Sequence, residues 1–170
     1  GSATINANST GAGKGGTVNV TANTGGGAGT IVSAGTISAK GAGAGIGGTA
    51  NLVANSSATL KVNDTINVSA GTTGNGGNIT IRNEGVAAGN GGIIVSKNLT
   101  ANATGNNTTG GNIVIDAVSA GFSSGAVTID PITFSANGAG TTSKGGSIAL
   151  RAGTAGVEIG RASCRERVSQ

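Results

Sequence analysis

The chain is organised around five Gly-Gly pairs, each of which is followed by alternating apolar and polar residues. The second glycines of these pairs are Gly16, Gly48, Gly77, Gly111 and Gly146. The apolar residues two and four positions later are Val18 and Val20, Ala50 and Leu52, Ile79 and Ile81, Ile113 and Ile115, and Ile148 and Leu150. Strict alternation with period two predicts a β-strand with one buried face. Five such strands at nearly regular spacing predict a repeat protein.

Two further sets of short apolar segments keep the same spacing. The first set precedes each Gly pair, and its leading aliphatic residues are Ile5, Ile37, Ile66, Leu99 and Ile132. These residues are separated by 32, 29, 33 and 33 positions. The second set closes the repeats at residues 30–33, 59–62, 93–96 and 126–129. Each repeat therefore supplies three short strands, joined by bends rich in Gly, Asn and Thr, which tolerate positive φ or bond to turn backbone.

Three strands per repeat predict an all-β fold, a right-handed parallel β-helix with about five coils of roughly 32 residues each. Residues 1–157 would form this solenoid, and small apolar side chains suit it because a narrow coil holds one layer of them. Two alternatives stay open at this point. Each repeat could contain two coils of about 16 residues, or the composition, with 35 glycines, could belong to a disordered linker.

The composition restricts the chemistry that this chain can perform. It has no His, Trp, Tyr or Met and a single Cys, so most catalytic and metal-binding sets of side chains cannot be assembled. The net charge of +4 arises from few acids rather than from a basic stripe, and no aromatic platform for bases exists. We therefore expect no nucleic-acid partner. No apolar run reaches the length of a membrane span, so we expect no membrane insertion by this segment.

Residues 158–170 differ from the rest in being densely charged, and they include Cys164. Residues 159–168 resemble the conceptual translation of a sequencing adapter read through at the end of a DNA fragment. We interpret 158–170 as a non-native or disordered tail, with a short basic extension as the alternative. The chain begins with Gly and shows no signal-peptide pattern in residues 1–20, so we interpret it as an internal segment of a longer protein.

Residues 36–48, 67–81 and 110–115, with their Gly-Gly-Asn-Ile-Thr-Ile type of strand, resemble the repeat regions of filamentous haemagglutinin-like exoproteins and large bacterial adhesins. The resemblance covers about residues 3–157 and is a pattern shared by many secreted repetitive proteins. It implies a long surface β-helix, exported by a two-partner or autotransporter route, that holds a binding region away from the cell. The secretion-domain signature and the membrane barrel of that family have no counterpart in these residues.

Parallel β-helices also include polysaccharide lyases and hydrolases, which use clustered carboxylates, so the acids of this chain are candidate catalytic residues. Asp116 and Asp130 follow strands and are expected at coil corners, where Asp commonly bonds to turn backbone. Asp64 and Glu84 belong to different segments, and Arg82 is expected to form a surface ion pair with Glu84. No Gly-Gly pair continues into a calcium-binding nonapeptide, and no phosphate-binding loop is present. We expect no catalytic, metal or cofactor site.

The sequence thus predicts a non-catalytic structural segment of a secreted or surface-exposed bacterial adhesin-type exoprotein. The alternative is a fragment of a β-helical polysaccharide lyase or hydrolase, or a carbohydrate-binding solenoid. Expected partners are a host-cell or environmental surface, carbohydrate or protein, and the flanking coils of a longer chain; the expected location is extracellular or on the outer cell surface. The longest bends, residues 21–29 and 117–125, are the expected contact points.

Overall fold

The computed structural model describes residues 3–23, 30–33, 35–85, 91–117, 125–153 and 157–159, and in these residues it contains strands and bends only. The strands form three parallel five-stranded sheets. Sheet A contains β1 (Ala3–Asn6), β4 (Gly35–Ser38), β7 (Ile66–Asn67), β10 (Leu99–Thr100) and β13 (Phe134–Ser135). Sheet B contains β2 (Thr17–Asn23), β5 (Thr49–Asn55), β8 (Asn78–Asn83), β11 (Asn112–Asp116) and β14 (Ser147–Arg151). Sheet C contains β3 (Val32–Ser33), β6 (Leu60–Val62), β9 (Ile93–Val95), β12 (Val127–Ile129) and β15 (Val157–Ile159).

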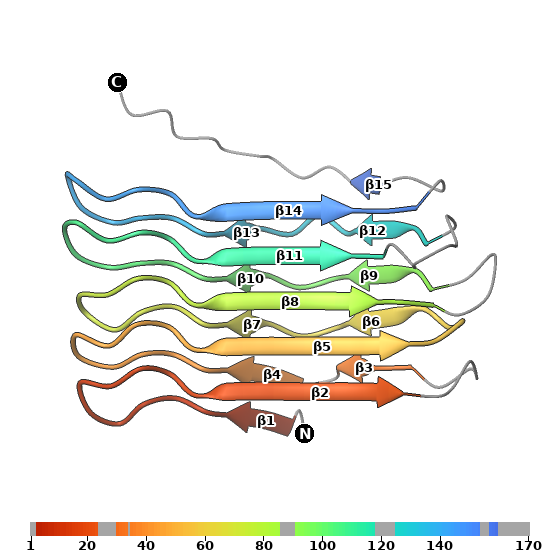
Figure 1. The fold of residues 1–170 in the computed structure, drawn as a ribbon, viewed down its shortest axis with the longest axis horizontal. Helices are drawn as coiled ribbons and strands as arrows, with labels where there is room; N and C mark the ends of the chain where they lie inside the picture. Colours follow the sequence, from red (N-terminus) through yellow and green to blue (C-terminus); the bar gives the residue numbers. More distant parts are fainter. Residues whose placement is uncertain are drawn as a thin grey trace.

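The chain winds through sheets A, B and C in turn and rises by one strand per circuit (Figure 1). The strands of sheet B run in one direction across the front and those of sheet A return behind them as the chain ascends, which makes the coil right-handed. Register partners in successive coils of sheet A are 32, 29, 33 and 35 residues apart. The β-helix prediction is therefore confirmed with one coil per repeat. The two-coil alternative and the disordered-linker alternative are wrong for the described residues.

The Gly pairs predicted the register of sheet B correctly. Ile79 lies opposite Ile113, and Ile81 lies opposite Ile115, as their equal distances from the preceding Gly pairs require. One prediction in sheet A is wrong, because Phe134 rather than Ile132 is the partner of Leu99. Phe134 precedes Gly146 by 12 residues, which is also the distance from Leu99 to Gly111. Ile132 is partly buried against the core just before β13.

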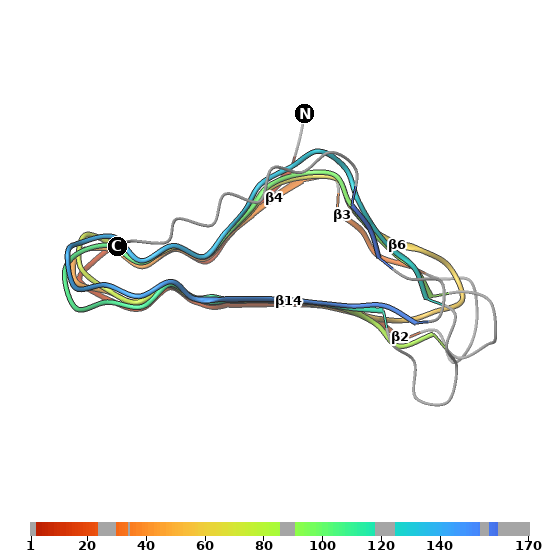
Figure 2. The same ribbon diagram turned by 90° about the horizontal axis from the view of Figure 1, so that it is seen from above.

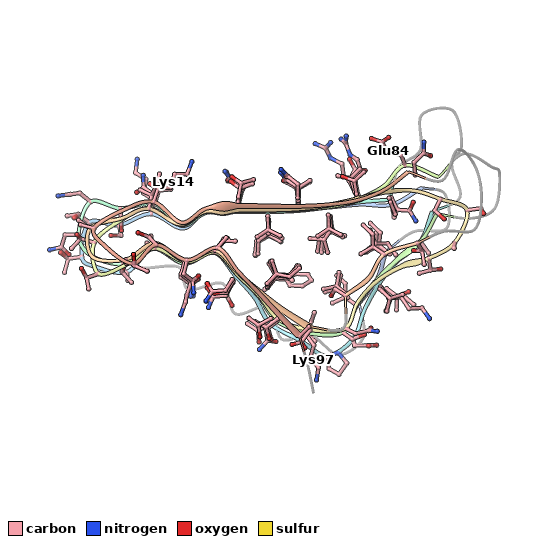
Figure 3. The ribbon with its side chains drawn as sticks, turned by 90° about the horizontal axis from the view of Figure 1, so that it is seen from below. Lys14, Glu84 and Lys97 are labelled. Atoms are coloured by element: carbon pink, nitrogen blue, oxygen red, sulfur yellow. The ribbon has the colours of Figure 1, made fainter. Side chains whose placement is uncertain are left out.

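The apolar core lies where the three sheets enclose a triangle (Figure 3). Alternate residues of each strand point inward, so β5 shows a regular succession of buried and half-buried positions. Stacked columns result, in which each side chain rests on its counterpart one coil away. The fully buried large members of these columns are Ile37, Leu52, Leu60, Ile66, Ile79, Ile81, Ile93, Leu99, Ile113, Ile115, Val62 and Val68.

Beyond the triangle each coil continues into a narrow extension in which two layers of backbone face each other (Figure 2). We call this part the Gly-rich extension; it comprises residues 7–16, 39–48, 68–77, 101–111 and 136–146. The sequence predicted turns here, yet the backbone ladder between coils continues, for example from Gly47 N to Asn75 O. In every coil the second glycine of the pair donates a backbone hydrogen bond across the extension to the opposite layer. These five bonds are Gly16 to Ala7, Gly48 to Ala39, Gly77 to Val68, Gly111 to Ala101 and Gly146 to Ala136, at 2.6–2.9 Å.

The Gly pairs are required because neighbouring coils approach each other closely at these positions. A Cβ on Gly76, the first glycine of its pair, would overlap the Ala101 carbonyl oxygen in the following coil. A Cβ on Gly77 would overlap the Gly48 carbonyl oxygen in the preceding coil. In the inner coils the two glycines of a pair thus leave room on opposite sides of one coil, and a side chain at either position would separate the backbones that the ladder joins.

Polar side chains form short ladders along the outer faces. Asn51 donates to Asn19 at 2.9 Å and Asn112 donates to Asn78 at 3.0 Å, so amides stack from coil to coil on sheet B. On the extension, the Asn102 side-chain oxygen accepts from Ser135 Oγ at 2.7 Å. Such bonds add to the backbone ladder, and they occupy positions that alternate with the buried columns.

At the last coil, β15 pairs with β12 through Val157, Glu158 and Ile159. β15 thus includes residues 158 and 159, which the sequence predicts to belong to the tail. Residues 160–170, with Cys164, lie outside the described part of the chain. No helix long and apolar enough to cross a membrane is found in the part that the structure describes.

Candidate functional site

Four charged side chains gather where the strands of sheet B end. Arg82, Asp116 and Arg151 are register partners at the end of β8, β11 and β14, so their side chains form one column. Asp116 Oδ2 lies 3.5 Å from Arg82 Nη2 and 3.9 Å from Arg151 Nη1. Glu84 Oε1 lies 3.3 Å from Arg82 Nη1. The guanidinium of Arg82 therefore bridges two carboxylates, and we call these four residues the charged column.

Burial differs strongly within the charged column. The Asp116 side chain is 7% exposed, whereas those of Arg82 and Glu84 are 45% and 46% exposed. A nearly buried carboxylate is stabilised only when charge partners and hydrogen bonds replace its lost hydration, and the two arginines supply that charge. The Arg82–Glu84 pair expected from the sequence is present, but Asp116 was expected at a corner after its strand. It is instead the last residue of β11 and the centre of the cluster.

A sequence signal for this column did exist. Arg82, Asp116 and Arg151 each follow the second glycine of their pair by five residues, and Thr21 and Val53 hold the same position in the first two coils. In a parallel solenoid, residues at equal distances from their preceding Gly pairs lie in one column. Counting from Gly77, Gly111 and Gly146 therefore predicts that an acid lies between two arginines.

Next to the charged column, Asn83 joins the end of sheet B to the following bend. It is fully buried, and its side-chain nitrogen donates to the carbonyl oxygens of Ala58 at 2.9 Å and Gly92 at 3.2 Å. Its side-chain oxygen accepts from the backbone nitrogens of Ser56 at 3.3 Å and Gly85 at 3.4 Å. One amide thus satisfies backbone groups from two coils and fixes this corner.

We call the edge at which sheet B turns into sheet C the B–C corner, and coil length varies most there. The connections between the sheet B and sheet C strands contain eight, four, nine, ten and five residues, whereas those between sheets C and A contain one to four. The bends that the sequence singled out, 21–29 and 117–125, both belong to the B–C corner. Residues 24–29 and 118–124 lie outside the described part of the structure. A shallow open depression beside the corner is lined by Thr21, Ala22, Val53, Asn55 and Glu84.

The two other candidate acids, Asp64 and Asp130, lie at a different edge, between sheets C and A. Asp64 Oδ1 accepts from Thr65 N at 2.8 Å and from Thr36 Oγ1 at 3.2 Å. Asp130 Oδ2 accepts from Ser96 Oγ at 2.6 Å, directly after β12. Both acids act as corner residues. Asp64, Glu84 and Asp116 are thus not brought together in one groove, and only Glu84 and Asp116 share a partner.

The lysines are dispersed over the molecule, as the sequence indicated. Lys14 lies on the Gly-rich extension and Lys97 at the corner between sheets C and A (Figure 3). The extension carries Lys14, Lys40 and Lys144 and no acid. Among the described residues, no group of three His, Cys, Asp or Glu side chains is placed to hold a metal ion. The charged column can therefore act as a polar contact surface, with two exposed arginines and one exposed carboxylate beside the depression.

Comparison with known proteins returned no family model, no curated protein and no solved structure that matches this chain.

Proposed function

We propose that this chain is a non-catalytic structural segment of a secreted or surface-exposed bacterial adhesin-type exoprotein. The observation that supports this most directly is the unbroken stacking of one coil type, with all three sheets continuing through five strands in register. A solenoid of this kind is stable through contacts between neighbouring coils, and its length scales with the number of coils. Such a rod serves to hold other parts of a protein at a distance.

The geometry suggests where a rod of this kind makes contact with a surface, carbohydrate or protein. The B–C corner accepts connections of different lengths without disturbing the sheets, and in repeat proteins such insertions commonly form the binding face. The charged column lies at the same edge, and its exposed arginines suit polar or anionic groups. We therefore place the expected partner contacts along this corner.

Deleting one whole coil tests the structural role. Removal of residues 37–65 joins Thr36 to Ile66, and because Ile37 and Ile66 are register partners, the shortened chain keeps every remaining column. We expect a folded rod that is shorter by one coil, about 4.8 Å, as measured by circular dichroism and small-angle X-ray scattering. Removal of residues 37–52 is the control, since it deletes fewer residues but breaks the circuit and should unfold the chain. Unfolding of both variants would contradict a modular rod.

Location is tested separately on cells that produce the protein. If the segment is exported, antibodies against the chain should label intact cells or detect the protein in the culture medium. Labelling that requires permeabilised cells would contradict the extracellular proposal, whatever the outcome of the coil deletion.

The second candidate, a carbohydrate-binding solenoid or part of a polysaccharide lyase or hydrolase, is supported by one observation. The outer face of sheet B presents amides held in ladders, with Asn51 bonded to Asn19 and Asn112 to Asn78, beside Arg82 and its two carboxylates. Incubation with a panel of soluble and insoluble polysaccharides distinguishes the two functions. Release of new reducing or unsaturated ends that is lost in Arg82→Ala and kept in Asp130→Asn would favour the enzyme. Retention on a polysaccharide without cleavage would favour the binding solenoid.

A further inference from the structure

The chain contains a single proline, Pro131, which follows Asp130 at the corner between sheets C and A. Both residues belong to the connection between β12 and β13, and both are exposed. Lys97 lies at the same corner one coil earlier, and Figure 3 shows its side chain pointing away from the core. The Asp130–Pro131 peptide bond therefore lies on the outer side of a corner and outside the sheets.

This peptide bond takes no part in the hydrogen bonds described between coils. The last backbone bond before it runs from Asp130 N to Val95 O at 3.1 Å. After it, Thr133 N donates to Asn98 Oδ1 of the preceding coil at 2.9 Å. Pro131 has no N–H to donate, and among the described residues no backbone bond to the Asp130 carbonyl oxygen is found. Breaking the bond thus removes none of the hydrogen bonds described between coils.

The acid at the same corner two coils earlier is held differently. Asp64 Oδ1 accepts from the N–H of the residue that follows it, Thr65, at 2.8 Å. Proline cannot donate this bond, and the Asp130 carboxylate accepts instead from Ser96 Oγ of the preceding coil, at 2.6 Å. The ion pairs found among the described residues all belong to the charged column. The other charged residues on the strands and corners beside Asp130 are Asp64, Lys97 and Glu158. Within the described part of the chain, one hydroxyl group and no cation thus holds the Asp130 carboxylate.

We propose that Asp130–Pro131 is a self-cleavage site, at which the Asp130 carboxylate breaks its own peptide bond in mild acid while the two parts of the rod stay joined. A side-chain oxygen of Asp reaches the carbonyl carbon of the same residue by closing a five-membered ring, so the attack needs no second residue. Carboxylates act as nucleophiles in enzymes through covalent intermediates of the same kind. The X–Pro bond is a tertiary amide whose nitrogen carries no hydrogen, and mild acid supplies the proton with which that nitrogen leaves.

The reaction consumes one water molecule for each bond that is cut. An Asp130 side-chain oxygen attacks the Asp130 carbonyl carbon, and a cyclic anhydride forms as the bond from that carbon to Pro131 N breaks. The nitrogen takes a proton from the solvent and leaves as a secondary amine. Water then opens the anhydride, which restores the side-chain carboxyl and leaves a second carboxyl at the new C-terminus. No oxidant, reductant or further co-reactant is needed.

All three sheets hold the two parts together across the cut. β13 pairs with β10, β14 with β11 and β15 with β12. The Gly-rich extension adds further bonds, including Ala101 N to Ser135 O at 2.7 Å and Gly110 N to Lys144 O at 2.9 Å. Since stability in a solenoid comes from contacts between neighbouring coils, the cut rod keeps the contacts of the uncut one. The parts, residues 1–130 and 131–170, separate only when the coils unfold.

The first test follows the covalent chain. The full chain is incubated at about pH 4 and at about pH 7, and the products are resolved on denaturing gels and identified by mass spectrometry. We expect two fragments in acid, one that ends at Asp130 and one that begins at Pro131, and an intact chain at neutral pH. An uncut chain would overturn the proposal, as would fragments that form only after the circular dichroism spectrum has lost its strand signal.

Three variants identify the attacking group. Asp130→Asn removes the carboxylate and Pro131→Ala restores an ordinary secondary amide, and each should slow cleavage at this bond at least about tenfold. Asp64→Asn is the matched control, since it removes the acid of the same corner two coils earlier, and it should be cut at the parent rate. Unchanged cleavage in Asp130→Asn, or an equal loss in Asp64→Asn, would show that the Asp130 carboxylate is not the nucleophile.

The second test asks whether the cut rod stays in one piece. Cleaved protein is returned to neutral pH, and its mass is measured by light scattering with and without urea. In buffer we expect the mass of the uncut chain, 15.8 kDa, and in urea two smaller species. Separation of the fragments in buffer would overturn the claim that the three sheets hold the two parts together.

Discussion

Replacing the first glycine of a Gly pair by alanine should have opposite effects in an inner coil and in the last coil. In Gly76→Ala the added methyl overlaps the Ala101 carbonyl oxygen and the Gly111 backbone nitrogen of the next coil. In Gly145→Ala the same atom enters open space. Neither glycine has a positive φ, so backbone strain does not contribute to the comparison.

The magnitude for Gly76→Ala follows from two contributions. Overpacking of a close contact costs about 1–3 kcal/mol. Two backbone bonds meet at this point, Gly76 N to Thr109 O at 3.0 Å and Gly111 N to Ala101 O at 2.7 Å, and each bond contributes about 0.5–1.5 kcal/mol. The lower entropy of the unfolded alanine chain returns about 0.4–1 kcal/mol. We expect a destabilisation of about 2–5 kcal/mol for Gly76→Ala and a stabilisation of about 0.4–1 kcal/mol for Gly145→Ala.

Urea unfolding followed by far-ultraviolet circular dichroism measures both changes. The comparison is internally controlled, since both variants add one methyl group at the same position of the repeat. Equal effects in the two variants would refute the reasoning, because they would show that these glycines are needed for local chain flexibility and not for the approach of neighbouring coils.

Three further predictions concern the core and the charged column. Ile113→Ala, at a fully buried position, should lower the free energy of unfolding by about 2–5 kcal/mol. Ile148→Ala, in the same column but 45% exposed, should lower it by less than half as much. Similar losses for the two variants in urea unfolding would contradict the stacked core. Asn83→Ala should cost about 2–4 kcal/mol, because it removes the four hydrogen bonds by which this amide joins the backbone of two coils. Asn112→Ala, on the exposed outer face, is the control, and a loss no larger than that of Asn112→Ala would show that the amide does not hold the corner. Asp116→Asn should destabilise the chain by about 1–3 kcal/mol, because the ion pairs with Arg82 and Arg151 are lost, and by less in high salt. Asp130→Asn should have a smaller effect. An effect of Asp116→Asn that does not depend on salt would argue against an ionic role.

Much of the fold could be predicted because the repeat fixes it. The alternation after each Gly pair defines the inward face of sheet B, and the constant distance of each strand residue from its own Gly pair defines the parallel register. The prediction of Ile132 as the partner of Leu99 is wrong because the local sequence around Ile132 resembles the other leading residues, whereas Phe134 has the same distance to its Gly pair as Leu99 has.

The Gly-rich extension could not be predicted from local patterns. Gly-rich segments ordinarily indicate turns, and nothing in segments such as 39–48 shows that their backbone continues the ladder between coils. The order of this part arises from the stacking of equivalent segments about 32 residues apart, and from the bond that closes each coil. The charged column illustrates the opposite case, because its three strand residues could have been aligned from the sequence by counting from the Gly pairs.

At the B–C corner, coils differ in length without any change in the register of the sheets. Connections there range from four to ten residues, yet Ile79, Ile113 and Ile148 stay in one column. A peptide grafted into any one of these connections would therefore be displayed at a fixed height along the rod, and several grafts would stand in line about 4.8 Å apart per coil. The solenoid thus offers evenly spaced attachment points along a single edge.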